Sequence, residues 1–177
     1  MVATMDNFEK SKELFESGDI QNTIETYEKA IDHIDRSKPK QKEEYIQFLE
    51  KILKYCQEKG LQIEEAMVMR ALGRTYSKFK QHAEGLKYSY QALKIQKKLG
   101  KKLDVAESLV FLAEDLEVSG NYDACINTFI EAAEAYHELG KLKKEKEITK
   151  EITRLKEFSK QMLEDEYILH KFNVDKY

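Results

Sequence analysis

The sequence predicts an all-α protein built from antiparallel helix pairs, and three observations lead to this fold class. Good helix formers (Glu, Lys, Leu, Ile and Ala) are abundant, and the chain contains a single proline. Apolar residues recur at steps of three and four, as one face of an amphipathic helix requires. Gly60, Gly100 and Gly140 lie 40 residues apart, each at the end of such a pattern. A fixed interval of this size is typical of helical repeat arrays.

The apolar patterns and the turn residues predict eight helices and no strand. The helices cover residues 4–17, 20–36, 41–58, 62–79, 82–98, 102–119, 122–138 and 142–169. The breaks at residues 17–19 and 119–121 read S-G-D and S-G-N, which combine a glycine with a residue that can cap the next helix. Pro39 marks another break, because the residue before a proline is disfavoured in the α conformation.

The repeat register divides one predicted domain, residues 1–177, into unequal parts. Residues 4–36 form a degenerate helix pair, residues 62–98 and 102–138 form two repeats, and residues 142–169 form a long C-terminal capping helix. Ala30 and Ala92 occupy matching positions but are 62 residues apart, which leaves room for one extra helix. Residues 41–58 supply it. This helix either interrupts the array, or pairs with residues 20–36 and leaves residues 4–17 as a cap.

Charge and hydropathy limit the classes of function. The formal net charge is −3 and the pI is about 5.9, so no global positive field favours nucleic-acid binding. The first ten residues lack the apolar core of a secretory signal. No apolar stretch approaches the ~18 residues needed to span a bilayer. These features predict a cytoplasmic protein without membrane insertion.

No motif for catalysis or metal binding is present. The sequence lacks the HExxH, GxGxxG, GxxxxGK[ST], GxSxG and CxxC patterns. The four histidines are scattered, with no second His or Cys at metal-ligand spacing. Cys56 and Cys125 lie in apolar helical patterns, where a free cysteine behaves as a small hydrophobic residue. We therefore expect no enzyme activity, no cofactor and no metal.

Several segments resemble the tetratricopeptide repeat (TPR) family. Residues 69–76 read M-x2-L-G-x2-Y, similar to the W-x2-L-G-x2-Y signature of the first TPR helix, with Met69 in place of Trp. Residues 125–132 and 23–30 read C-x3-F-x2-A and T-x3-Y-x2-A, similar to the A-x3-F pattern of the second helix. The interval of 40, rather than about 34, resembles the TPR proteins related to kinesin light chains and bacterial peptide-pheromone receptors. The resemblance implies a right-handed solenoid of helix pairs.

The resemblance also implies that the first helix of each pair lines a concave groove. On residues 62–79 the groove-facing stripe comprises Met67, Arg70, Arg74, Ser77 and Lys78. On residues 102–119 it comprises Glu107, Val110, Glu114, Glu117 and Val118. Arginine forms bidentate contacts with carboxylates, so the first stripe predicts capture of an acidic or C-terminal segment of a partner. In the alternative, its two arginines pair with glutamates of the second stripe and neutralise the groove.

The sequence therefore predicts a protein–protein interaction module, an adaptor or scaffold that binds a peptide or helix of a partner protein in its concave groove. The alternative is a self-assembling structural unit, in which the C-terminal helix or the extra helix at residues 41–58 buries its apolar stripe against another copy. The C-terminal segment carries such a stripe at Ile148, Ile152, Leu155, Met162, Leu163 and Leu169.

Overall fold

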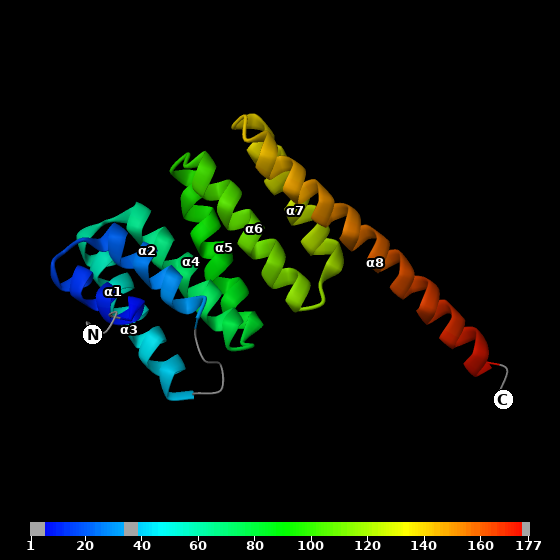
Figure 1. Cartoon of the computed structure of the whole chain (residues 1–177), viewed down its shortest axis with the longest axis horizontal. Coiled ribbons are helices and arrows are strands. Elements are labelled where there is room, and N and C mark those ends of the chain that lie inside the picture. Colours follow the sequence, from blue (N-terminus) through cyan, green and yellow to red (C-terminus); the bar gives the residue numbers. More distant parts are fainter. Residues whose placement is uncertain (1–5, 34–38, 175–177) are drawn as a thin grey trace, which may run out of the picture. The chain divides into compact units, whose positions relative to one another are not determined.

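A computed structural model describes residues 6–33 and 39–174 of the chain. Within these residues the helices are α1 (Asn7–Glu16), α2 (Ile20–Ile31), α3 (Pro39–Lys59), α4 (Gln62–Lys78), α5 (His82–Lys98), α6 (Lys102–Val118), α7 (Tyr122–Glu138) and α8 (Leu142–Val174) (Figure 1). The predicted all-α fold class is confirmed for this part of the chain. The chain divides into two compact units, Met1–Asp104 and Val105–Tyr177. A continuous right-handed solenoid across both units stays a prediction.

Most observed helix bounds lie close to the predicted ones, but the helix predicted at residues 20–36 was too long, because α2 ends at Ile31 and residues 32 and 33 form a turn. α3 to α7 begin and end within two residues of the predicted positions. α8 continues five residues beyond the predicted end, to Val174. The predicted helical residues 4, 5 and 34–36 lie outside the described part of the chain.

The turns that follow α1 and α3 to α7 each contain a residue with a left-handed backbone. Gly60, Gly100 and Gly140 have φ angles of 67°, 65° and 67°. A Cβ atom disfavours this conformation, whereas glycine adopts it without steric cost. After the glycine, Lys101 donates its backbone N–H to the Gln96 carbonyl over 3.1 Å, which satisfies the last turn of α5. The 40-residue glycine interval therefore corresponds to real helix ends.

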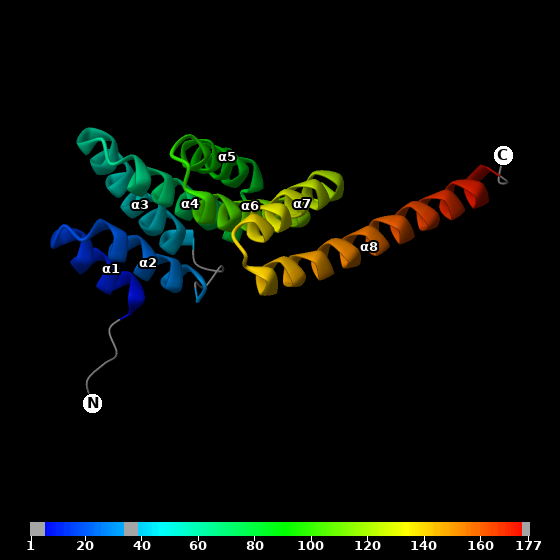
Figure 2. The same cartoon turned by 90° about the horizontal axis from the view of Figure 1, so that it is seen from above.

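In the first unit, α1, α2 and α3 share an aromatic core. α1 packs against α2, and α3 packs against α4; Figure 2 shows α1 and α2 together on one side of α3 and α4. Phe8 of α1 stacks on Tyr45 of α3 with ring centroids 3.9 Å apart. Tyr27 of α2 meets the same Tyr45 ring at 5.6 Å. The extra helix predicted by the sequence thus packs against both helices of the first pair.

The pair formed by α4 and α5 is held at a short distance by two glycines. A Cβ atom on Gly73 would lie 3.0 Å from the Gly85 carbonyl oxygen and would overlap the Ser89 hydroxyl. Beside this contact, Tyr76 and Tyr88 stack with ring centroids 5.6 Å apart. The glycine of the L-G motif therefore has a packing reason, since a larger side chain would force the helices apart.

In the second unit, α6 and α8 run in the same direction and α7 runs back in the opposite one (Figure 1). Ile148, Ile152 and Leu155 of α8 are buried, and α8 packs against α7. α7 has 17 residues and α8 has 33, which corresponds to lengths of about 25 and 50 Å. The distal half of α8 therefore runs past the end of α7, as Figures 1 and 2 both show.

Gly73→Ala should lower the free energy of unfolding by about 1–3 kcal/mol, because the added methyl group separates α4 from α5. This loss should exceed the gain of about 1 kcal/mol that alanine brings to a helix. Urea unfolding followed by circular dichroism measures it. The double variant Gly73→Ala/Ser89→Ala should recover part of the loss, since it removes the hydroxyl that the methyl group meets. A single variant as stable as the wild type would contradict the close contact.

Candidate functional site

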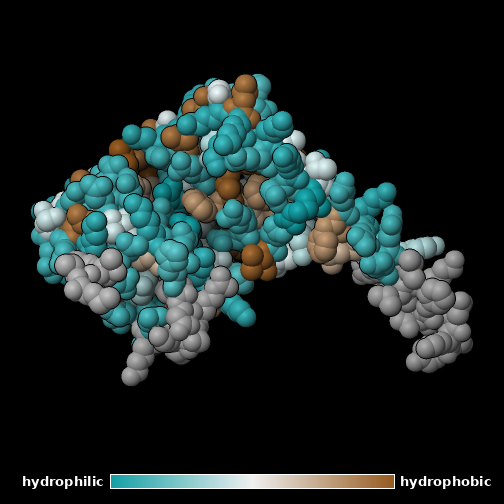
Figure 3. Space-filling model, in the orientation of Figure 1, coloured by the Kyte–Doolittle hydropathy of each residue, from teal (hydrophilic) through white to brown (hydrophobic). Residues whose placement is uncertain are grey.

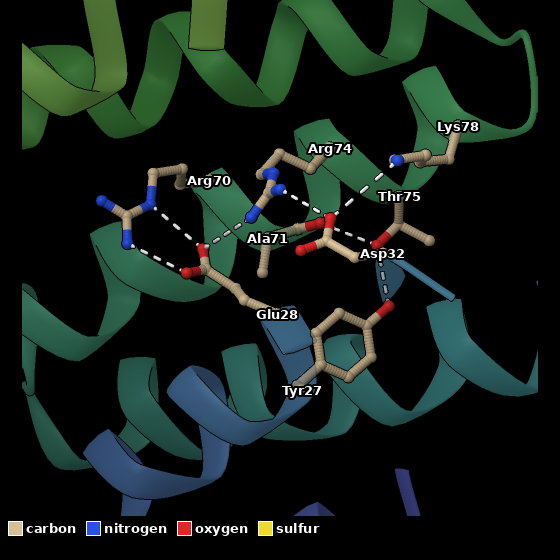
Figure 4. A network of polar contacts seen from close by, with 8 residues as sticks. All are labelled: Tyr27, Glu28, Asp32, Arg70, Ala71, Arg74, Thr75 and Lys78. Carbon is tan, nitrogen blue, oxygen red and sulfur yellow. Dashed lines mark hydrogen bonds and ion pairs between the residues drawn. The ribbon is translucent and has the colours of Figure 1, made fainter. Parts of the chain in front are cut away.

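The predicted stripe on α4 meets carboxylates from the end of α2 (Figure 4). Arg70 donates from Nε to Glu28 Oε1 over 3.2 Å and from Nη2 to Glu28 Oε2 over 3.4 Å. One turn later, Arg74 donates from Nη2 to Asp32 Oδ1 over 3.1 Å. Lys78 Nζ lies 3.9 Å from the same Asp32 oxygen. Three cations of the stripe are therefore engaged by two acids within the first unit.

Burial makes the first of these ion pairs energetically important. The side chains of Arg70 and Glu28 are 9% and 17% exposed. Taking charges out of water is costly, and attraction offsets that cost while both partners are present. The planar guanidinium presents two N–H groups to two carboxylate oxygens, a geometry that lysine cannot reproduce. Removing either partner would break two charge-assisted hydrogen bonds at a largely buried site.

A neutral contact joins the same two helices beside the ion pairs. Thr75 Oγ1 donates to the Ala71 carbonyl over 2.7 Å. Tyr27 Oη lies 2.7 Å from Thr75 Oγ1 and is therefore the donor in that bond. Tyr27 is fully buried, and this burial raises the pKa of its phenol above the ordinary value. α2 and α4 are thus joined by a buried hydrogen-bond chain as well as by charge.

These partners were missed by the sequence analysis, which considered only glutamates of the second stripe. Each acid precedes its arginine by 42 residues. The signal was two acids one helical turn apart on α2 and two arginines one turn apart on α4, but the intervening α3 hides their proximity. Capture of an acidic segment by this stripe stays a prediction. Such a segment would have to compete with Glu28 and Asp32.

The second unit contains an open groove between α6 and α8. Its volume is about 370 Å³, and its lining comprises Val110, Glu114, Glu117, Phe129, Tyr136, Lys144, Glu147, Ile148 and Glu151. Phe129, Tyr136 and Ile148 are only 3–5% exposed and form an apolar floor. The volume lies in the range of about 300–1,000 Å³ that is common for binding sites. We call this feature the α6–α8 groove.

The charged side chains of the α6–α8 groove are mainly acidic. Four glutamates and one lysine line it. Arg154 lies on α8 one turn after Glu151, the last lining residue of that helix. It donates to Glu117 over 2.9 Å and to Glu151 over 2.8 Å. Lys144 Nζ lies 3.2 Å from Glu147 Oε2. Acids outnumber bases even with Arg154 included, so the groove carries a net negative charge.

The structure distributes the predicted site residues over two places. Val110, Glu114 and Glu117 line the α6–α8 groove. Their neighbour Glu107 is half-buried on α6 and is not part of that lining. On α4, Met67 packs partly buried against the core of the first unit. The two stripes belong to different units, so a single groove that includes both stays a prediction.

The sequence analysis also missed the contribution of α8 to the groove. Lys144, Glu147, Ile148 and Glu151 come from this helix. Glu147 lies 40 residues after Glu107, so the repeat register itself carried the signal. The interpretation of α8 as a cap had left it out of the groove.

The two cysteines and the arrangement of possible metal ligands bear on nucleophilic and metal chemistry in the described residues. Cys56 and Cys125 are buried and unpaired, and burial raises the pKa of each thiol to about 11. Both thiols are therefore protonated and weakly reactive at neutral pH. Within residues 6–33 and 39–174, no group of three or more His, Cys, Asp or Glu side chains could hold a metal ion. None of the described helices is long and apolar enough to cross a membrane.

Known proteins resemble this chain in fold. No family model and no curated protein matches it. A crystal structure described as nearly identical TPR-like repeats of a Podosopora anserina kinesin light chain aligns at 14% identity and a TM-score of 0.47, over 86% of this chain and 94% of that chain. A crystal structure of a single-residue variant of those repeats gives the same identity and TM-score, over 88% and 95%. The chain is similar to TPR-like repeats. At this identity the likeness concerns the fold alone.

Glu28→Gln should lower the free energy of unfolding by about 2 kcal/mol or more, because it removes the charge of a largely buried carboxylate that accepts two hydrogen bonds from Arg70. Chemical unfolding measures the loss. The double variant Glu28→Leu/Arg70→Met should stay within about 1 kcal/mol of the wild type, because it removes both charges. Glu9→Gln, which breaks the exposed pair with Lys12, is the control and should cost less than about 0.5 kcal/mol. Equal losses for Glu28→Gln and Glu9→Gln would contradict the special role of the buried pair.

The two thiols should react slowly with an aromatic disulfide reagent in the native protein at pH 8, and both should react at once after addition of guanidinium. Their pKa values are raised in the folded state, so their contribution to stability is present below pH ~9 and declines as the pH rises toward about 11. The urea midpoint should therefore be lower at pH 10 than at pH 8. Rapid labelling of the native protein would show that the thiols are not buried.

Proposed function

We propose that this protein is a protein-interaction module and that its α6–α8 groove binds a segment of a partner protein with apolar and basic side chains. The observation that carries the proposal is an apolar floor beneath an acidic rim, within one compact unit. The floor offers buried aromatic and aliphatic surface, and the rim selects the charge of what lies on it. Polar contacts along the rim would fix the orientation of the bound segment.

The shape of the groove favours a chain segment over a small molecule. α6 and α8 run in the same direction on its two sides, so the groove follows the helices rather than closing around a point. An extended or helical segment could place apolar side chains on Phe129, Tyr136 and Ile148. Each such side chain would contribute about 1.5–3 kcal/mol on full burial. Ordering of the segment offsets much of that gain, so modest affinity is expected.

The charges of the groove favour a basic segment. Lysine or arginine side chains of the partner would approach Glu114 and Glu147, which lie on opposite sides of the groove. An acidic segment would meet net negative charge there, and on α4 it would compete with Glu28 and Asp32 for the arginines. Electrostatic complementarity thus distinguishes the two surfaces. The basic segment is the occupant that the geometry supports best.

A phage-displayed library of random 16-residue peptides (about the span of a repeat helix) tests the proposal, with selection on the full chain and titration of the selected peptides by fluorescence anisotropy. The selected sequences should combine Lys or Arg with apolar residues. The groove variant Glu114→Lys/Glu147→Lys should bind them at least about tenfold more weakly. The control Glu84→Lys/Glu134→Lys changes the net charge equally at exposed positions outside the groove and should bind normally. Acidic selected sequences, or equal binding by the groove variant, would refute the assignment.

A further inference from the structure

A run of lysines follows the exposed side of α5 into the turn before α6. Residues 85–103 contain six lysines and no Asp or Glu, although the whole chain has 33 acids. All six lysines are exposed. We call them the α5 lysine cluster: Lys87, Lys94, Lys97, Lys98, Lys101 and Lys102. The chain as a whole is acidic, so this stretch is a local positive surface on the first unit.

The cluster forms one stripe along α5. Lys94 and Lys98 are four residues apart, and Lys87 precedes Lys94 by seven, which are the spacings of one side of a helix. Tyr90 lies on the same stripe and is 51% exposed. From Lys87 to Lys98 the stripe is about 16 Å long. Figure 2 shows α5 at the edge of the first unit, on the far side of α4 from α1 and α2.

Repeat packing does not require these lysines. At the positions 40 residues later, α7 has Glu134 and Glu138 where α5 has Lys94 and Lys98, and all four residues are exposed. An equivalent helix therefore carries the opposite charge at the same places. The positive charge is a property of α5 and not of the repeat.

Helix stability does not account for the whole cluster either. The macrodipole favours lysines in the last turn of a helix, where Lys97 and Lys98 lie. It gives no such benefit to Lys87 and Lys94 in the body of α5, and it disfavours Lys102 at the first position of α6. Like charges four residues apart also destabilise a helix. The cluster is therefore better explained by a ligand that lies outside the helix.

The chemistry of the cluster favours a diffuse anionic surface as that ligand. Every cation in the cluster is a lysine, although the chain also contains four arginines. Arginine grips a single carboxylate or phosphate with two N–H groups, whereas the lysine ammonium is a hydrated point charge on a flexible stem. A bilayer with anionic lipids attracts many such charges at once, and each lysine near its surface strengthens binding about fivefold. An exposed tyrosine is typical of the same interface, because its ring has an apolar body and a polar end.

We propose that the α5 lysine cluster docks this protein on an anionic lipid surface, with Tyr90 at the level of the headgroups. The face of the first unit drawn in Figure 3 is mostly hydrophilic, which suits attachment by charge rather than by burial of a large apolar area. The α6–α8 groove belongs to the second unit. The inference therefore does not rest on the groove or on what binds there.

Other anions match the cluster less well. Proteins that bind single-stranded nucleic acid stack successive bases on several aromatic side chains. Within residues 85–103, Tyr90 is the exposed aromatic residue, since Tyr88 is half-buried and stacks on Tyr76. An acidic protein segment would gain most from arginine, which holds carboxylates in a fixed geometry. The lipid surface is the ligand that needs neither feature.

Flotation of the full chain with phosphatidylcholine vesicles, with and without phosphatidylserine, tests the docking. The wild type should bind only the vesicles that contain phosphatidylserine, and binding should decline as the salt concentration rises. Lys87→Glu/Lys94→Glu/Lys98→Glu should bind at least about tenfold more weakly. The neutral variant Lys94→Gln/Lys98→Gln should give an intermediate loss, and circular dichroism should show that both variants stay helical. A wild type that does not bind phosphatidylserine vesicles at low salt would overturn the proposal.

A matched variant separates the cluster from net charge. Lys10→Glu/Lys146→Glu/Lys150→Glu makes the same change in charge at exposed positions outside the cluster and should bind within about twofold of the wild type, because distant charges are screened. The groove variant Glu114→Lys/Glu147→Lys keeps the cluster and should not bind more weakly. Equal losses for the two triple lysine variants would refute docking through α5.

The tyrosine and competing ligands complete the test. Tyr90→Ala should weaken vesicle binding about threefold, whereas Tyr167→Ala, at a tyrosine of α8 that is 69% exposed, should leave it unchanged. Equal binding by both would contradict the position of the Tyr90 ring at the headgroups. A single-stranded oligonucleotide or a glutamate-rich peptide should bind more weakly than the vesicles. Tighter binding of either one through the same lysines would overturn the assignment to lipid.

Discussion

α3 to α7 are each followed by a turn that contains a residue with a left-handed backbone. This local constraint determines where one helix stops and the next begins. α4, α5, α6 and α7 are each 17 residues long, and three residues separate each from the next. Glycine occupies the left-handed position in most of these turns, while Lys80 does so between α4 and α5 with φ 61°. Equal helices joined by equal turns bring residues 40 apart to the same place on equivalent helices. The α6–α8 groove follows from that equality, because its two sides are equivalent helices.

The inserted helix α3 changes this regularity and the electrostatics of the first unit. It packs its aromatic side chains against α1 and α2, and it also packs against α4. α2 can still reach α4, with a separation of 42 residues between paired charges. The arginines of α4 consequently meet acids from a preceding helix. An arginine stripe that looks like a binding surface in the sequence is also part of what joins α2 to α4.

The fold was predictable because its signals are local or strictly periodic. Gly60, Gly100 and Gly140 mark helix ends, and Gly73 permits a contact that the structure places against Gly85. Those signals depend on backbone sterics, which neighbouring residues reveal. The pairing of Arg70 with Glu28 depends on where a whole helix is inserted, which no local pattern encodes. Val110, Glu114 and Glu117, which the TPR resemblance implied would face a groove, line the α6–α8 groove, while their role in binding a partner stays a prediction.

The repeats keep apolar residues at their buried positions and vary the charged residues at other positions. The conserved packing maintains the fold, whereas the varied charges would determine which partner binds. Leu72, Leu112 and Ile152 stand 40 residues apart, and all three are buried. At another set of equivalent positions, where the side chains are partly or fully exposed, the sequence has Arg74, then Glu114, then Arg154. A core site accepts residues of similar volume and shape, whereas a charge on the surface is free to change sign without cost to packing. In the second unit that variation leaves Arg154 facing a groove with four glutamates. The excess of negative charge, rather than the helical framework, is therefore what would select a basic partner over an acidic one.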